Sequence, residues 1–305
     1  MDKNPTIVNK AMDEKQISPL KTPVIICNEL ISGWRTYKTE ENFHLQPTHF
    51  EVETTTMWSF PNRGFWATHT PHYRGNWSPQ TVRNIILLYS KVNDLILDPM
   101  VGGGTTPLEC MLTGRNSISV DINPNAVSLT CDRLSLPEVY KHQLPETIHK
   151  IFIGDTRKLT KIKDSTIDLL MVHPPYFNII KYTNLDKDLS NIDTKNEFFD
   201  YFRQAIFEYY RVLKENSYCV VLMGDTRKNG HFIPLSTRMM IEFLDAGFIL
   251  KEEIIKTEWN CRSDNSHYKY KNPNFLFIKH EHLFVFRKPT LKEKYANQGC
   301  GGLFA

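Results

Sequence analysis

The chain has 305 residues, of which 41% are hydrophobic and 23% charged, and its formal net charge is +3. This size suits one large domain with extensions, and no apolar run approaches the roughly 20 residues that a membrane-spanning helix needs. The polar N-terminus is not typical of a secretory signal, and six scattered cysteines without a CxxC pair argue against a zinc ribbon or a disulfide framework. We therefore expect a cytoplasmic protein without a membrane contact.

The first part of the chain gives little sign of regular structure. Residues 1–56 show weak periodicity and many polar residues, which predicts a loosely ordered N-terminal arm. From Met57 the sequence becomes MWSFPNRGFWATHTPHYRGNWSPQ, which is too rich in proline and glycine for a long helix or strand. Its aromatic rings are interleaved with Arg63, Arg74 and His72, a pattern that suits either packing or a nucleic-acid surface.

Strands and helices then alternate along the chain. A helix is predicted from Pro79, because Ser78 can cap its N-terminus and proline is favoured at the first helical position. The strands are expected at residues 95–98, 117–121, 151–154, 168–172, 218–224, 248–255 and 282–286. The remaining helices are expected at residues 106–112, 124–134, 195–213 and 234–246. This alternation predicts an α/β fold with a mostly parallel, doubly wound, seven-stranded sheet and an antiparallel edge formed by the last two strands. The main domain is expected over residues 57–290, followed by a C-terminal tail over residues 291–305.

Glycine residues follow the first of these strands, at the edge of the sheet where ligands of open α/β folds bind. Gly102, Gly103 and Gly104 let the backbone approach a ligand closely and take positive φ. Thr105 and Thr106 can cap the helix that follows. Taken alone, a glycine-rich turn is weak evidence of a ligand site.

Acidic residues make the prediction of a ligand more specific. Asp121 ends the second strand, where a carboxylate can accept both hydroxyls of a ribose. Asp155 follows the third strand and can accept a hydrogen bond from an adenine amino group. No phosphate-binding lysine follows the glycines, and Asp98 precedes them. A nucleoside with a charged amino-acid tail therefore fits this edge better than ATP or NAD.

The stretches DPMVGGGTT, VDINP, GDTRK and HPPY occur in this order and resemble the motifs of the S-adenosylmethionine-dependent DNA amino-methyltransferases, which modify N4 of cytosine or N6 of adenine. The resemblance covers about residues 77–288 and implies a class I Rossmann-like methyltransferase fold with S-adenosyl-L-methionine as the cofactor. It implies that the glycine loop with Asp98 holds the methionine portion, Asp121 the ribose and Asp155 the adenine. The stretch GNWSPQTVRN resembles the family's cofactor-flanking motif. The cofactor-binding residues expected from the resemblance are Trp77, Ser78, Asp98, Pro99, Gly102, Gly104, Thr105, Thr106, Asp121, Ile122 and Asp155.

The corner His173-Pro174-Pro175-Tyr176 ends the fourth strand and holds the expected catalytic residues. Two prolines remove two backbone donors and fix φ twice, which leaves a stiff carbonyl free of sheet pairing. An exocyclic amino group is a poor nucleophile because its lone pair is delocalised into the ring. One acceptor for each N–H would aim that lone pair at the methyl group. Tyr176 can stack on a base that has left the duplex, a contact worth roughly 1–3 kcal/mol.

The first residue of this corner departs from the family, which usually has Asp, Asn or Ser where this chain has His173. A neutral imidazole can accept one N–H through its unprotonated nitrogen; alternatively, His173 faces solvent and only backbone acceptors remain. Because histidine is bulkier, it favours the single ring of cytosine. We expect a DNA methyltransferase acting on N4 of cytosine. The alternatives are N6 of adenine in DNA, N2 of guanine in RNA, and an inactive nucleic-acid-binding fold.

Two segments are expected to contact the nucleic acid. The segment 259–282 mixes basic and aromatic residues, and Arg262, Tyr268, Lys269 and Lys271 are expected to bind DNA, unless this segment is a solvated loop. The loop 178–193 is expected to fold over the flipped base. The scattered histidines lack the spacing of a metal site, so no metal is expected. The expected partners are double-stranded DNA and a possible restriction endonuclease, and the expected state is a monomer or homodimer.

Overall fold

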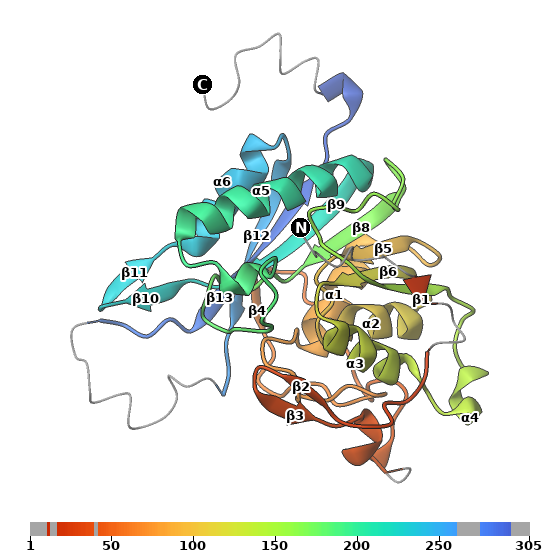
Figure 1. The fold of residues 1–305 in the computed structure, drawn as a ribbon. Coiled ribbons are helices and arrows are strands. Elements are labelled where there is room, and N and C mark those ends of the chain that lie inside the picture. The colour runs from red at the N-terminus through yellow and green to blue at the C-terminus, as the bar shows by residue number, and fades with distance from the viewer. Residues whose placement is uncertain (1–10, 13–16, 40–41, 261–274, 294–305) are drawn as a thin grey trace, which may run out of the picture.

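The computed structural model describes residues 11–12, 17–39, 42–260 and 275–293. Among these residues, one sheet of nine strands runs in the order β1-β7-β6-β5-β8-β9-β13-β12-β4 (Figure 1). The strands are β1 (Ala11–Met12), β4 (Met57–Ser59), β5 (Leu95–Asp98), β6 (Asn116–Asp121), β7 (His149–Ile153), β8 (Ile167–Val172), β9 (Leu213–Met223), β12 (Ile249–Thr257) and β13 (His280–Arg287).

The predicted fold class is confirmed. The five strands from β7 to β9 are paired in parallel, and β13 runs antiparallel to both β9 and β12. The last two strands therefore form the antiparallel pair that was expected near one edge. Two short strands were not expected: β4 extends this edge in parallel with β12, and β1 pairs antiparallel with β7 at the other edge.

Helices cover both faces of the sheet. They are α1 (Pro79–Tyr89), α2 (Thr105–Thr113), α3 (Pro124–Leu134), α4 (Glu138–Lys141), α5 (Lys195–Val212) and α6 (Leu235–Asp245). Consecutive residues of β5 face opposite sides: Leu97 packs with α5 and α6, whereas Ile96 packs with α1. This alternation is the period of two that a strand buried on both faces requires. The two apolar layers fix the sheet, so that the ends of its parallel strands form one rigid edge.

The helix starts show one expectation confirmed and one wrong. Ser78 caps α1, and its hydroxyl accepts the Thr81 N–H with Pro79 at the first position. Thr105 and Thr106 do not cap α2 as expected. The cap is Gly104, at φ +80°, and no side chain bonds there. Because the chain turns into α2 through a left-handed residue, both threonines already lie inside the helix.

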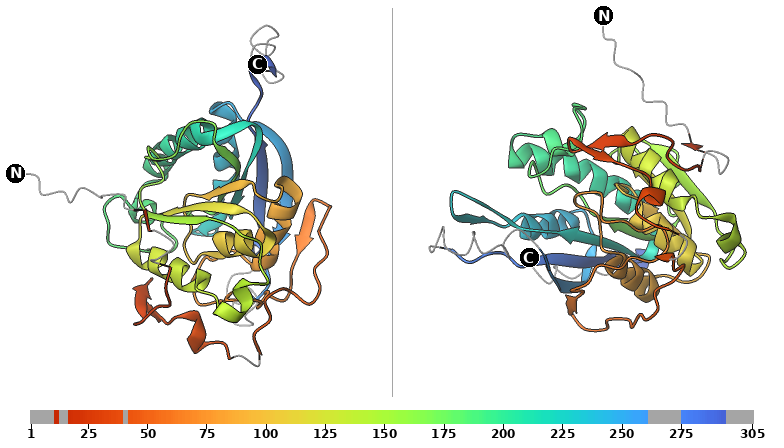
Figure 2. Two further views of the ribbon diagram at one scale, coloured as in Figure 1. Left: turned by 90° about the vertical axis from the view of Figure 1, so that its right-hand side faces the viewer. Right: turned by 90° about the horizontal axis from the view of Figure 1, so that it is seen from below.

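The N-terminal segment packs on the body of the protein. A hairpin of β2 (Val24–Ile26) and β3 (Glu29–Ile31) lies beside α3, as Figures 1 and 2 both show, and the short helix η2 (Trp34–Thr36) follows. The Asp132 carboxylate of α3 accepts the N–H groups of Leu20 and Trp34 at 2.8 and 2.7 Å. Residues 17–39 are therefore anchored by buried hydrogen bonds as well as by apolar contacts.

Three small elements complete the description. The strands β10 (Thr226–Lys228) and β11 (His231–Ile233) form a hairpin after β9, and the short helix η4 (Leu189–Asn191) lies between β8 and α5. Within the described ranges, every helix is too short or too polar to cross a membrane.

Candidate functional site

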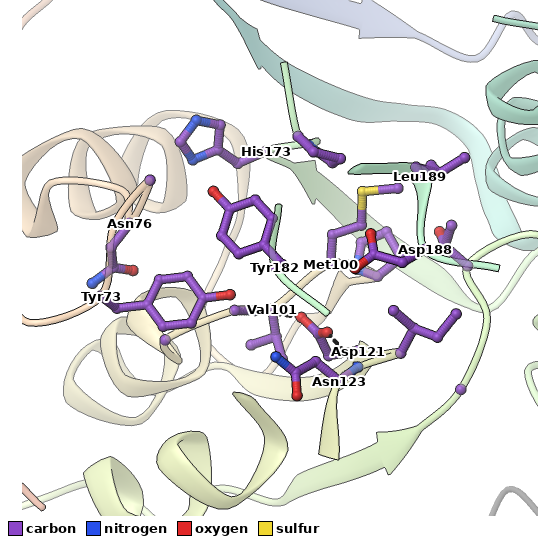
Figure 3. A pocket seen from close by; sticks show the side chains of 18 of the residues that line it. Tyr73, Asn76, Met100, Val101, Asp121, Asn123, His173, Tyr182, Asp188 and Leu189 are labelled. Atoms are coloured by element: carbon purple, nitrogen blue, oxygen red, sulfur yellow. Dashed lines mark hydrogen bonds between the residues drawn. The ribbon is translucent and has the colours of Figure 1, made fainter. Parts of the chain in front are cut away.

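A pocket opens where the parallel strands end. It encloses about 740 Å³ of empty space when the open solvent at its mouth is included. Residues 99–103 after β5, 121–123 after β6, 154–156 after β7, and His173 and Pro175 after β8 line it. The remaining walls come from Tyr73 and residues 75–77 before α1, and from Tyr182 and residues 187–189 after β8. Four strand ends and two distant loops thus meet in one cavity (Figure 3).

The glycine turn has the shape that the sequence predicts. Gly102 has φ +51°, and a Cβ placed on it would lie 3.1 Å from the Tyr73 ring. The buried Arg133 guanidinium donates to the Gly103 carbonyl and to Thr70. Because a side chain at Gly102 would meet Tyr73, this turn can approach a ligand with its backbone only. Gly102 lines the pocket, whereas Gly104 lies behind it as the cap of α2.

Asp121 lies in the wall of the pocket, as expected, with Ile122 beside it. Its two carboxylate oxygens accept the N–H groups of Gly102 and Asn123, both at 2.8 Å. Burial raises the pKa of Asp121 to about 6, although these two backbone hydrogen bonds favour the ionised form. Each oxygen keeps a free lone pair, so the carboxylate remains able to accept donors from a ligand.

Asp98 lies beneath the glycine turn rather than in the pocket wall. It is 1% exposed, and one oxygen accepts the Met100 N–H at 3.1 Å. The Thr106 hydroxyl also lies beside this carboxylate and favours its ionised form. Burial raises the pKa of Asp98 to about 7, and the negative Asp121 adds to this shift. The adjacent Pro99 lines the pocket, but Thr105 and Thr106 do not.

Asp155 also lines the pocket, but its carboxylate is already occupied. The Arg157 guanidinium binds it in a two-pronged contact, with Nε 2.9 Å from one oxygen and Nη2 2.8 Å from the other. Arg157 also donates to the carbonyl of Lys187 and lies over the Tyr201 ring at 5.0 Å. An adenine amino group would therefore have to share this carboxylate with Arg157.

The His173-Pro174-Pro175-Tyr176 corner follows β8, and two of its residues reach the pocket. His173 and Pro175 line it, and the Trp77 ring lies edge-on to His173 at 5.0 Å. Ser78, by contrast, serves only as the cap of α1. Burial lowers the pKa of His173 to about 4, so the imidazole is neutral near pH 7.

Tyr176 does not line the pocket. Its ring packs on Gly224, where a Cβ would lie 2.6 Å from it. The hydroxyl donates to Glu281 at 2.5 Å and lies 2.9 Å from Nε2 of His173. Lys256 donates to the other oxygen of Glu281, also at 2.5 Å. The aromatic residue expected to stack on a base is thus bound through its hydroxyl to a buried ion pair.

Two tyrosines of the pocket were not predicted as site residues. The rings of Tyr73 and Tyr182 stack with their centroids 6.0 Å apart and an angle of 16° between their planes. Figure 3 shows both rings pointing into the cavity between Asn76 and Asp121. Tyr182 belongs to the loop 178–193, which was expected over the site, and Tyr73 belongs to the aromatic-rich segment. The loop and the aromatic-rich segment were both visible in the sequence, but neither pattern assigned its tyrosine to the pocket.

The remaining site residues expected from the sequence cannot be placed. Arg262, Tyr268, Lys269 and Lys271 lie outside the described residues. Across the described part of the chain, no cluster of three or more His, Cys, Asp or Glu side chains could hold a metal ion. His69, for example, is buried against the Glu109 carboxylate at 2.7 Å, and burial lowers its pKa to about 4.

Comparisons with known proteins agree with the motifs. The type II methyltransferase M.MjaII of Methanocaldococcus jannaschii is 44% identical over 52 residues, which are 17% of this chain and 10% of the relative. M.MjaI, a type II methyltransferase of the same organism, is 27% identical over 173 residues, covering 47% of this chain and 56% of the relative. The matched segments thus span a tenth of the length of M.MjaII and little more than half of the length of M.MjaI. Among solved structures, TrmN from Thermus thermophilus aligns with 14% identity and a TM-score of 0.43, over 70% of this chain and 50% of that chain.

A family model described as DNA methylase matches residues 9–132 and 167–299. The match includes the glycine turn, Asp121 and the His-Pro-Pro-Tyr corner, which confirms the family expected from the motifs. Because the model covers well over half of the sequence, this chain belongs to the N6/N4 DNA methylase family.

Proposed function

We propose that this protein transfers a methyl group from S-adenosyl-L-methionine to the exocyclic amino group of a base in double-stranded DNA, at N4 of cytosine. One observation carries the proposal: His173 and Pro175 line the same pocket as Asp121 and the glycine turn. The groups expected to orient the target amine and those expected to hold the methyl donor therefore share one cavity. The target base must leave the duplex to reach it.

The pocket fits the cofactor that family membership supports. Asp121 offers a buried acceptor for ribose hydroxyls, and the side-chain amide nitrogen of Asn123 is buried without a partner among the described residues. Asp98 adds a buried carboxylate beneath the turn, outside the pocket wall, whose negative charge would attract a positively charged amino group without contacting it. When bound, S-adenosylmethionine supplies an electrophilic methyl group on a sulfonium ion.

The chain's own contribution is to orient the amine. Neutral His173 can accept one amino N–H, since its pKa near 4 leaves a ring nitrogen unprotonated. The Pro175 carbonyl accepts the Phe177 N–H at 2.9 Å. Pro174 lies between two residues of the pocket lining, and no residue that the structure describes donates to its carbonyl, so this carbonyl is the better candidate for the second N–H. Two fixed acceptors would point the nitrogen lone pair along one direction, and such positioning contributes most of the catalysis that this reaction needs.

The preference for cytosine rests on the size of His173. A histidine at the mouth of a base pocket leaves less room than Ser, Asp or Asn, and cytosine has one ring where adenine has two. The second candidate is N6 of adenine. It is favoured by a relative named DNA adenine methyltransferase YhdJ from Escherichia coli, which is 23% identical over 125 residues, 41% of this chain and 42% of the relative.

The test is to supply radiolabelled S-adenosylmethionine with unmethylated duplex DNA or with tRNA. The DNA is then digested to nucleosides and analysed by mass spectrometry. We expect N4-methylcytosine. N6-methyladenine alone would overturn the choice of base, and label in tRNA only would overturn the choice of substrate. Cofactor binding without transfer to either nucleic acid would favour an inactive methylase fold.

A further inference from the structure

Four polar side chains form a chain of hydrogen bonds that begins at the pocket. It runs from His173 after β8 to Tyr176, then to Glu281 on β13 and Lys256 on β12. The successive distances are 2.9, 2.5 and 2.5 Å. Only His173 lines the pocket, so the other three lie behind it.

The direction of these hydrogen bonds follows from the last pair. An ammonium only donates, so Glu281 accepts from Lys256. Although burial alone would raise the pKa of Glu281, Lys256 beside it and its other hydrogen bonds hold that pKa below its usual range. The carboxylate is therefore ionised and must also accept the Tyr176 hydroxyl proton. Since a phenol has only one proton, Tyr176 can only accept from His173.

This order selects one tautomer of the imidazole. Nε2 of His173 carries the proton and donates to Tyr176, which leaves Nδ1 without one. Nδ1 has no hydrogen-bond partner elsewhere in the residues that the structure describes. His173 lines the pocket and its Nε2 is engaged by Tyr176 behind the lining, so the unprotonated Nδ1 is the ring nitrogen left to accept an amino N–H.

We propose that Glu281 and Lys256 are positioning residues that act through the Tyr176 hydroxyl to keep Nδ1 of His173 an acceptor for the target amine. This inference rests on the proposed function and explains how a histidine serves where the family usually has Asp, Asn or Ser. Those side chains carry an oxygen acceptor in every orientation, whereas a histidine accepts only at its unprotonated nitrogen. A histidine at this position therefore needs a further residue that determines its tautomer.

The buried ion pair is poorly explained by stability alone. Glu281 and Lys256 have side chains only 9% and 15% exposed, and burying two charges usually costs about as much as their attraction returns. A structural role would be to tie the corner after β8 to β13. The two roles differ in one respect. The structural role needs only that these side chains remain in contact, whereas the positioning role also needs each hydrogen bond to keep the same donor and acceptor.

Glu281→Gln reverses that direction at nearly constant volume. The amide oxygen turns toward Lys256, which can only donate, so the amide NH₂ faces Tyr176. The Tyr176 proton is then free to point to Nε2 of His173, and the ring proton moves to Nδ1. The acceptor is lost, and we expect kcat to fall roughly 100-fold, since one preorganised hydrogen bond is removed. Cofactor affinity and the unfolding midpoint should change little.

The readout that separates the roles is the ¹⁵N spectrum of ¹⁵N-histidine-labelled protein, because protonated and bare ring nitrogens resonate in separate ranges. The His173 signals are identified by their loss in His173→Gln. We expect the Nε2–H tautomer in the wild type and the Nδ1–H tautomer in Glu281→Gln. The matched control is Glu253→Gln on β12, whose carboxylate contacts His282 at 2.9 Å and lies outside the chain. It should keep both the His173 spectrum and kcat.

A second variant tests the link through the hydroxyl. Tyr176→Phe keeps the ring but breaks the chain, so adding Glu281→Gln to it should lower kcat no further. A wild-type Nδ1–H tautomer, an unchanged tautomer in Glu281→Gln, or additive losses of kcat in the double variant would overturn the inference. The spectra need no substrate. A wild type that shows the Nε2–H tautomer but transfers no methyl group to DNA would therefore contradict the proposed function and not the order of the hydrogen bonds.

Discussion

Asp98 is a buried carboxylate whose charge the free protein compensates only in part. Burial raises the pKa to about 7 from an ordinary value of 3.8, although the Thr106 hydroxyl and the Met100 N–H favour the ionised form. Between these two pH values the folded state binds more protons than the unfolded state. Stability therefore falls as the pH rises through this window and stays low above it. A buried carboxylate that lowers stability in this way is expected where a ligand requires its negative charge.

Asp98→Asn should therefore stabilise the free protein at pH 8 by roughly 2–4 kcal/mol, because it removes the buried charge. The same change should weaken S-adenosylmethionine binding. Thermal unfolding at pH 8 and calorimetric titration measure the two effects. Asp132→Asn is the matched control, and it should lower the unfolding temperature, since Asp132 accepts two backbone N–H groups. A less stable Asp98→Asn protein would contradict this account.

Asp121 differs from Asp98 because it lines the pocket and has two backbone partners. Asp121→Ala should weaken cofactor binding roughly 100-fold or more, since hydrogen bonds to a charged group contribute about 1.5–3 kcal/mol each. Calorimetric titration measures the loss. Asn125→Ala is the control, because Asn125 follows the same turn but binds the Ile25 carbonyl outside the pocket. Equal affinities for Asp121→Ala and the wild type would remove Asp121 from the site.

At the scale of elements, the loop after β8 contacts the segment before α1 where the Tyr182 side chain lies close to the backbone of Gly75. Gly75 has φ +78°, and a Cβ there would lie 2.3 Å from the Tyr182 hydroxyl, which donates to the Arg74 carbonyl at 3.3 Å. Gly75→Ala should push the loop away from the pocket and weaken cofactor binding about tenfold, by roughly 1.4 kcal/mol. The dissociation constant measures the effect.

Two further variants separate the collision from the backbone strain of Gly75→Ala. Tyr182→Phe removes the hydroxyl that collides, so adding it should restore part of the affinity. Gly247→Ala carries a similar strain, at φ +93°, but the added Cβ has no neighbour closer than 3.7 Å. It should lower stability without changing cofactor affinity. Equal losses of affinity in Gly75→Ala and Gly247→Ala would show that the close approach has no role.

The long elements could be predicted because their patterns repeat. In α5, buried side chains recur at helical spacing over 18 residues, and its N-cap Thr194 is a usual capping residue. A three-residue strand such as β4 has no period to detect, and its pairing depends on β12, almost 200 residues away. For the same reason the stacking of Tyr73 on Tyr182 could not be predicted. The motifs assigned Asp121 and His173, but only the packing of β13 beside β9 brings Glu281 to Tyr176.

At the scale of the whole molecule, DNA binding depends on where positive charge lies rather than on its sum. The formal net charge is only +3, and the pocket lies at the carboxyl ends of the parallel strands. The segment that joins β12 to β13 leaves from this same edge, because Thr257 ends β12 and His280 begins β13 there. Lys269 and Lys271 belong to this segment, outside the described residues. Their phosphate contacts remain a prediction from the sequence.

Changing Lys269 and Lys271 together to Gln should flatten the salt dependence of DNA binding. Each phosphate contact contributes about 0.9 to the slope of log K against log salt concentration, so the slope should fall by roughly two units.

The control is the double change Lys91→Gln and Lys251→Gln. Both lysines are exposed and lie near the amino ends of the strands β5 and β12, opposite the pocket. Each double change lowers the formal net charge from +3 to +1, that is, 3 − 2. If net charge governed binding, the two double variants would show the same slope. If the segment between β12 and β13 contacts phosphates, only the first variant loses the two units, and methyl transfer to DNA weakens while cofactor affinity is kept.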